Sequence, residues 1–130
     1  MQPTDPNKFT EKAWEAIVKS QDVARRSQQQ QLEVEHLLVD LQEQNGLAST
    51  ILTAAAVAIP RFQKQVEDFL RVQPKVANPE QLYLGRSLEV WLDRSDESRQ
   101  SFGDEFISIE HLLLGLLDDD RLGKRLFRNH

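Results

Sequence analysis

The chain has 130 residues, of which 39% are hydrophobic and 28% are charged, as in an ordinary soluble globular domain. Its net charge of −5 argues against a general nucleic-acid-binding protein, which needs a basic face to contact phosphates. The absence of cysteine excludes disulfides, zinc–thiolate sites and thiol catalysis.

No targeting or membrane-spanning signal is apparent in the sequence. The N-terminal stretch MQPTDPNKF has no basic start and no apolar core, so we expect no signal peptide. No apolar run approaches the roughly 20 residues that are needed to span a bilayer. We therefore expect a single cytoplasmic domain over residues 1–130, with neither nucleic acid nor membrane as a partner.

Four helices are expected in the first part of the chain. Asp5 and Pro6 are typical of an N-cap and a first helical residue. Apolar residues at helical spacing predict the other three helices, and Asn45–Gly46 is a signal that ends the second of the four. The four expected helices are 6–27, 34–44, 47–55 and 60–72.

The segment 73–81 contains two prolines and little apolar content, which predicts a linker. Beyond it we expect a helix from about Leu84 to Ser101, a turn over 102–106, a helix over 107–117 and a short helix from Leu122. No segment has the pattern of a strand, so the predicted fold class is all-α.

The chain contains an internal repeat with an offset of 75 residues. LEVEHLLVDLQ (32–42) and ISIEHLLLGLL (107–117) share Glu-His-Leu-Leu and the apolar spacing i, i+3, i+4 and i+7, which places the apolar side chains on one helix face. We expect two pseudo-symmetric repeats of up to four helices each, at about 5–72 and 82–130. The counterpart of helix 60–72 would lie beyond residue 130, so the last helix of the second repeat is missing, which favours a fragment of a longer protein.

No pattern in the chain predicts catalysis or metal binding. His36 and His111 each follow a glutamate, but neither has a second ligand one turn away, so we expect local hydrogen bonds or packing at the edge of the core. Nucleophile-elbow and phosphate-loop motifs are missing. The run Asp118–Asp120 lacks the spacing of a calcium loop and is expected to be a solvated loop. We predict that the chain is not an enzyme and holds no cofactor or metal of its own.

The turn before the second repeated helix carries the most suggestive surface residues. Phe102 and Phe106 flank it, with Asp104 and Glu110 close by in sequence. The phenylalanines could fill the core. Alternatively, they could form an apolar groove with an acidic rim, suited to an extended polypeptide.

Several stretches resemble the Clp N-terminal domain, which consists of two Clp repeats. NKFTEKAWEAIVKSQ with LEVEHLLVDL resembles the first repeat, and GDEFISIEHLLLGLL followed by DDDRLGKRLF resembles the second. YLGRSLEVWLDRSDESRQSFGDEFISIEHLLLG is most similar to the ClpB-type branch of ring-forming AAA+ disaggregases, and the glutamine-rich segment 28–31 is similar to cyanobacterial members. The resemblance covers essentially the whole chain and implies a fold of two pseudo-symmetric four-helix repeats.

The resemblance also implies a function. ClpB-type N-terminal domains are mobile elements at the entrance of a hexameric ATPase ring that engage unfolded or aggregated polypeptide, in cooperation with a DnaK-type chaperone system. The acidic positions of the family's G-D-x-F-I-S-x-E pattern match Asp104 and Glu110. The expected substrate-binding residues are Asp104, Glu110, Phe102, Phe106 and Leu92. ATP and Mg²⁺ would belong to AAA+ modules that this chain does not contain.

Two alternatives remain open at this stage. One is a ClpC- or ClpA-type domain that docks adaptors or degradation tags for a partner protease. In that branch the position of Glu35 and Glu110 helps to recognise phosphoarginine. The other is a small helical enzyme or metal protein that uses His36 and His111.

Overall fold

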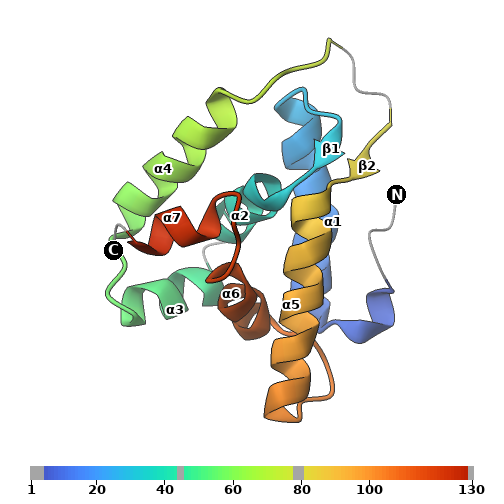
Figure 1. Cartoon of the computed structure of the whole chain (residues 1–130), viewed down its shortest axis with the longest axis vertical. Coiled ribbons are helices and arrows are strands. Elements are labelled where there is room, and N and C mark those ends of the chain that lie inside the picture. The colour runs from blue at the N-terminus through green and yellow to red at the C-terminus, as the bar shows by residue number, and fades with distance from the viewer. Residues whose placement is uncertain (1–4, 44–45, 78–80, 129–130) are drawn as a thin grey trace.

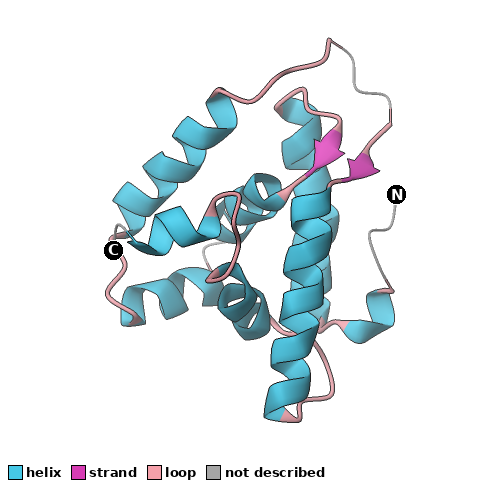
Figure 2. Cartoon of the chain, viewed as in Figure 1, coloured by secondary structure: helices cyan, strands magenta, loops and turns pink. Residues whose placement is uncertain are grey.

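The computed structural model describes residues 5–43, 46–77 and 81–128, and in this part the chain is almost entirely helical (Figures 1 and 2). The first repeat contains η1 (Pro6–Lys8), α1 (Glu11–Arg26), β1 (Gln31–Leu32), α2 (Val34–Glu43), α3 (Leu47–Ala54) and α4 (Ile59–Arg71). The second repeat contains β2 (Tyr83–Leu84), α5 (Arg86–Phe102), α6 (Ile109–Leu116) and α7 (Gly123–Arg128).

The core lies where the repeated helices pack against the long helices. α2 packs mainly on α1, and α6 packs mainly on α5, while α1 also contacts α6 and α2 also contacts α5. Ile17, Leu37, Leu112 and Trp91 are fully buried there. The indole N–H of Trp91 donates to the carbonyl of Leu112 at 2.6 Å, which satisfies the one polar group of this side chain.

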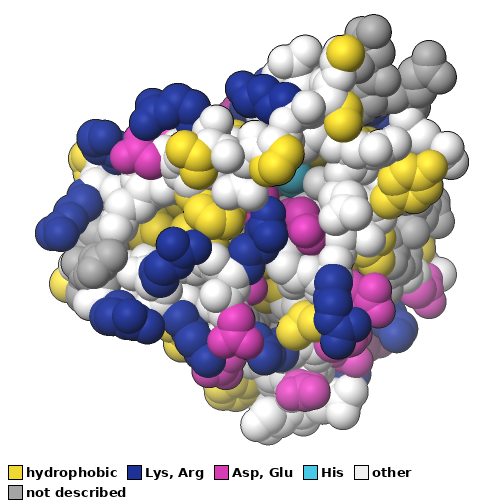
Figure 3. All heavy atoms as spheres, turned by 45° about the horizontal axis from the view of Figure 1, so that its top comes forward, with side chains coloured by type: hydrophobic (Ala, Val, Ile, Leu, Met, Phe, Trp, Pro, Cys, Tyr) yellow, Lys and Arg dark blue, Asp and Glu magenta, His cyan; other side chains and the backbone are white. Residues whose placement is uncertain are grey.

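On the surface, α4 and α7 carry many Lys and Arg side chains (Figure 3).

Two backbone bridges join the repeats and obey the same 75-residue offset. In the short parallel sheet, Leu32 of β1 pairs with Leu84 of β2. A second parallel bridge pairs Phe9 with Ile107. With the 75-residue offset, Phe9 corresponds to Leu84 and Leu32 corresponds to Ile107. Each bridge therefore joins the same two positions of the repeat, one taken from the first copy and the other from the second. The pseudo-symmetry that the sequence predicts is therefore present in the backbone hydrogen bonds.

The structure corrects two expectations about local structure. The chain does contain strands, although each has only two residues. The predicted helix 6–27 is broken, because Phe9 leaves the helix to pair with Ile107 and Thr10 caps a new start by accepting from the N–H of Ala13 at 3.2 Å. Asp5 does cap, but only a single 3-10 turn.

The run Asp118–Asp120 is likewise not a uniformly solvated loop. Asp119 is buried, and one of its carboxylate oxygens accepts from the N–H groups of Leu122 and Gly123 at 2.8 and 2.7 Å. Asp119 therefore caps the start of α7, as an acidic side chain does at the positive end of a helix. The other predicted helices agree with the structure to within two residues where it describes them, and Gln44 and Asn45, at the expected end of the helix 34–44, lie outside the described residues.

The two repeated histidines fix the starts of α2 and α6. The Nδ1 atom of His36 accepts the N–H of Glu33 at 2.9 Å, and Nδ1 of His111 accepts the N–H of Ser108 at 2.9 Å. The other ring nitrogen of His36 contacts the side-chain oxygen of Gln29. The expected local hydrogen bonding of both histidines is confirmed.

The environment of His36 keeps its ring neutral. The side chain is fully buried, and this burial lowers the pKa of His36 to about 4, although the neighbouring Glu35 carboxylate acts in the opposite direction.

Glu35, which is buried, and Arg121, which is partly exposed, form an ion pair between the repeats. The guanidinium donates from Nε to one Glu35 oxygen and from Nη2 to the other, both at 2.9 Å, and also donates to the side-chain oxygen of Gln73 at 3.2 Å. The side chain of Glu35 is only 1% exposed. The pair raises the pKa of Arg121 above its usual value and attaches the loop before α7 to the start of α2.

No helix of the described residues has the length and apolar character needed to cross a membrane.

Replacement of Arg121 by Met is expected to destabilise the chain by about 3–5 kcal/mol, because it leaves the Glu35 carboxylate buried without a countercharge. Urea denaturation measures the change. The double substitution of Met for both Glu35 and Arg121 removes the two charges together and is expected to recover most of the loss. If the double variant is as unstable as the single one, the loss does not come from an uncompensated carboxylate.

The pKa of His36 predicts a pH dependence of stability. The unfolded chain binds a proton at His36 below pH 6.5, whereas the folded chain resists protonation down to about pH 4. The contribution of this residue is therefore complete above pH 6.5 and is lost as the pH falls towards 4, by up to about 3 kcal/mol. Denaturation curves of the chain and of His36→Gln over this interval check it. The variant is expected to have the flatter profile, and equal slopes would contradict the assignment.

Candidate functional site

The turn between α5 and α6 is held in a fixed shape by backbone hydrogen bonds. Gly103 ends α5 in the left-handed conformation, with φ of 71°, which a residue without a side chain adopts at little cost. The N–H of Asp104 donates to the carbonyl of Arg99 at 3.1 Å, and the Arg99 guanidinium donates back to the Asp104 carbonyl at 3.0 Å. The turn therefore presents its side chains from a defined backbone.

Both phenylalanines of this turn lie on the surface. Phe102 is 65% exposed and Phe106 is 43% exposed, so the expectation that they fill the core is wrong. The Phe102 ring lies with its centroid 6.2 Å from that of His111. Large exposed aromatic side chains on a rigid turn are typical of a surface that contacts another molecule.

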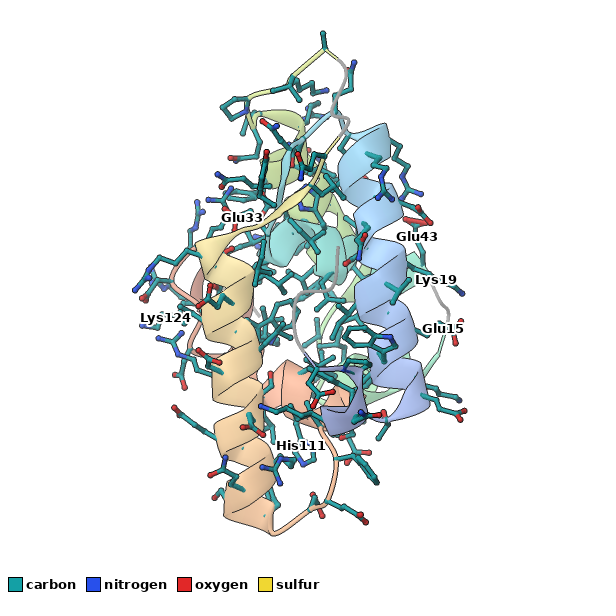
Figure 4. All side chains as sticks on the ribbon, turned by 90° about the vertical axis from the view of Figure 1, so that its right-hand side faces the viewer. Glu15, Lys19, Glu33, Glu43, His111 and Lys124 are labelled. Atoms are coloured by element: carbon teal, nitrogen blue, oxygen red, sulfur yellow. The ribbon has the colours of Figure 1, made fainter. Side chains whose placement is uncertain are left out.

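Asp104 is oriented by the second repeated helix. Its Oδ2 lies 2.8 Å from Nε2 of His111, whose other ring nitrogen takes part in the capping box with Ser108 (His111 is labelled in Figure 4). His111 is buried, whereas the Asp104 side chain is 55% exposed. In the first repeat, Gln29 corresponds to Asp104 and His36 corresponds to His111, and these two side chains are also in contact. The histidine partner is therefore a neutral amide in the first repeat and an exposed carboxylate in the second.

The surroundings of the turn are acidic. Residues 89–110 contain seven acidic and two basic residues, a net charge of −5. Arg99 donates to Asp96 at 2.7 Å and thereby lowers the pKa of Asp96, so this part of the surface keeps its negative charge. A cationic or neutral apolar ligand is therefore favoured over an anionic one.

Glu110 is exposed at the N-terminus of α6 and borders an apolar groove of about 350 Å³ between α3, α6 and α7. Leu114 of α6 and Leu117, which directly follows this helix, contribute to the groove and are both partly exposed. The remaining lining residues are Ile51, Leu52, Ala55, Leu113 and Phe127. Sequence reasoning missed this groove, because its walls come from three helices of both repeats.

Glu110 corresponds to Glu35 in the first repeat, but it lacks the arginine that pairs with Glu35. The loop residue that corresponds to Arg121 is Gly46, which has no side chain that could pair with Glu110. The Glu35 carboxylate is thus buried and paired with Arg121, whereas the equivalent Glu110 carboxylate is exposed to solvent.

Four of the five predicted site residues are exposed within one short segment of the chain. Phe102, Asp104, Phe106 and Glu110 are exposed on the turn and on the first turn of α6. We call these four residues the turn surface. Leu92 is buried in the core on α5, so it can support this surface but does not form part of it.

The described residues contain no group of three or more His, Cys, Asp or Glu side chains placed to hold a metal ion.

Comparisons with known proteins agree with this architecture. The family described as the Clp repeat (R) N-terminal domain matches residues 8–130. Two chaperone proteins of Synechocystis, ClpB 2 and ClpB 1, are 56% and 58% identical over 129 residues, which are 98% of this chain. The chain spans only 15% and 14% of the length of these relatives.

Among solved structures, the N-terminal domain of Hsp104 from Candida albicans is similar, with a TM-score of 0.83 and 22% identity over 94% of this chain and 81% of that one. At this level of identity the likeness concerns the fold. The fold, the internal repeat and the match over residues 8–130 lead to one conclusion: the chain belongs to the Clp repeat N-terminal domain family.

Proposed function

We propose that this chain is the N-terminal domain of a ClpB-type chaperone and engages unfolded or aggregated polypeptide through the turn surface. The observation that carries the proposal is the exposure of Phe102 and Phe106 beside the accessible carboxylates of Asp104 and Glu110. An unfolded client exposes apolar side chains, and clients with basic residues nearby would gain from the acidic surroundings. The similarity to ClpB proteins over nearly the whole chain supports this assignment.

Contact with clients is expected to be weak and tolerant of sequence. Two phenylalanines bury little area compared with a standard protein interface, and the accessible carboxylates steer association more than they add affinity. Such binding suits a domain that must collect many different polypeptides and release them. The step that consumes energy would then belong to another part of the protein.

At the level of the full-length protein, we propose a cytoplasmic hexameric ATPase ring. Its AAA+ modules would supply ATP and Mg²⁺ chemistry, and a DnaK-type system would cooperate in freeing aggregated clients. The chain itself would carry out client contact without catalysis.

The protease-associated alternative receives less support from the geometry. Recognition of phosphoarginine at the position of Glu35 requires an accessible carboxylate, whereas Glu35 is enclosed and paired with Arg121. Docking of an adaptor at Glu110 would be the form of this alternative that the structure accommodates.

Replacement of both Asp104 and Glu110 by Ala is expected to weaken client binding by about fivefold, as the loss of two accessible charge contacts worth about 0.5 kcal/mol each would do. NMR titration of the isolated chain with an unfolded, non-aggregating client measures binding. In the full-length protein the same variant is expected to lower reactivation of aggregates while ATP turnover stays near its original rate.

Glu11 of α1 and Glu67 of α4, two exposed carboxylates outside residues 89–110, provide the matched control. Their double replacement by Ala removes the same charge and is expected to leave client binding within about twofold. Equal losses in both double variants would show that net charge alone is responsible. Unchanged binding in the Asp104 and Glu110 variant would contradict the proposal.

A further inference from the structure

A second surface on this chain has the opposite electrostatic character. Between α4 and α7 lies a slot of about 360 Å³, whose apolar lining is formed by Phe69, Val72, Leu122 and Leu126. Val72 is 73% exposed, although it is a large apolar residue. The slot uses no residue of the turn surface.

Two arginines lie against the aromatic ring in the lining of this slot. The guanidinium carbons of Arg121 and Arg125 lie 5.3 and 5.2 Å from the centroid of the Phe69 ring. Arg121 is engaged by Glu35, whereas the Arg125 guanidinium donates to the carbonyl of Arg121 at 2.6 Å and has no carboxylate partner among the described residues. Arg125 therefore keeps an uncompensated positive charge at the edge of an apolar surface.

The acidic residue at the slot does not reverse this character. Asp68 lines the slot but is bonded to Lys64 at 3.0 Å and to Arg71 at 2.8 Å, and Lys64 contributes most to lowering its pKa. α7 adds Lys124, Arg125 and Arg128 and contains no acidic residue. Figure 3 shows Lys and Arg side chains around hydrophobic ones on this part of the molecule.

We infer that the α4–α7 slot is a docking site for an acidic polypeptide segment that carries an aromatic or large aliphatic anchor. The anchor would enter the slot against Phe69 and Val72, and flanking carboxylates would face Arg125 and the basic residues of α7. Charge complementarity selects this occupant, because a basic segment would meet the unpaired Arg125 guanidinium at the edge of the apolar area. The domain then has two contact surfaces with opposite charge preference.

The test uses ¹⁵N-labelled chain and two short synthetic peptides, each with one phenylalanine, flanked in one peptide by Asp and Glu and in the other by Lys. We expect the acidic peptide to shift amide resonances of residues 65–72 and 122–126, and the basic peptide to leave them in place. Arg125→Glu is expected to weaken binding of the acidic peptide by about fivefold or more. Val72→Asp, which alters an exposed position without a buried contact, is expected to act in the same direction.

Lys12→Glu is the matched control, since Lys12 is exposed on α1 and the substitution changes the net charge by as much as Arg125→Glu does. We expect it to alter affinity by less than about twofold. Equal weakening by Lys12→Glu, equal shifts with the basic peptide, or shifts confined to residues 102–110 would each overturn the proposal. Concentration-dependent shifts at the slot without peptide would show that a second copy of the chain occupies it, which also contradicts the assignment. Because the slot and the turn surface share no residue, failure here leaves the proposed client surface unaffected.

Discussion

The two exchanged backbone bridges are the constraint on which the rest of the structure depends. The bridge between Leu32 and Leu84 brings the start of α5 next to the start of α2, and the bridge between Phe9 and Ile107 does the same for α1 and α6. Each repeated helix is thereby placed between the long helix of its own repeat and that of the other repeat. The apolar faces of α2 and α6 are buried from both sides, which neither repeat could achieve alone.

Once this frame is set, the differences between the repeats decide which positions are available for function. Thr10 caps α1 with its own side chain, whereas the corresponding residue at the start of α5 is Gly85, where an added Cβ would collide with the Glu33 carboxylate. Glu33 caps α5 instead, because its Oε1 accepts from the backbone N–H of Ser87 at 3.3 Å and from the Ser87 hydroxyl at 2.9 Å (Glu33 is labelled in Figure 4). The acidic side chains at the start of α2, Glu33 and Glu35, are thus bound within the molecule, while Asp104 and Glu110 of the second repeat remain in contact with water.

The sequence alone predicted the helices well where one face of a single element carries the signal. The spacing of Val34, Leu37, Leu38 and Leu41, and the same spacing in α6, predicted the repeated helices and their buried faces. The break before Thr10 could not be predicted, because it depends on pairing of Phe9 with a residue in the other repeat. Strands of two residues have no alternation from which they could be recognised.

The candidate site was predictable to a similar extent, and for similar reasons. Asp104, Phe102, Phe106 and Glu110 are close in sequence, so their clustering follows from one turn. The Glu35–Arg121 pair joins residues 86 positions apart, and no local pattern indicates it. Leu92 was predicted as a site residue from its place in the sequence, and its side chain is buried in the core.

The pseudo-symmetry also explains why α6 has an exposed apolar groove at all. Leu113 and Leu114 of α6 correspond to Leu38 and Val39 of α2, and α4 packs on α2 with Phe62 and Val66 buried. Among the described residues no counterpart of α4 covers α6, and the groove is the surface that remains. The groove therefore follows from the pattern of a helical repeat, so its apolar lining is weak evidence for client binding. The exposure of Phe102 and Phe106 does not follow from the repeat in this way. The turn that carries them corresponds to the glutamine-rich segment of the first repeat, which has no large apolar side chains at these positions. Their exposure is the stronger reason to place client contact on the turn surface.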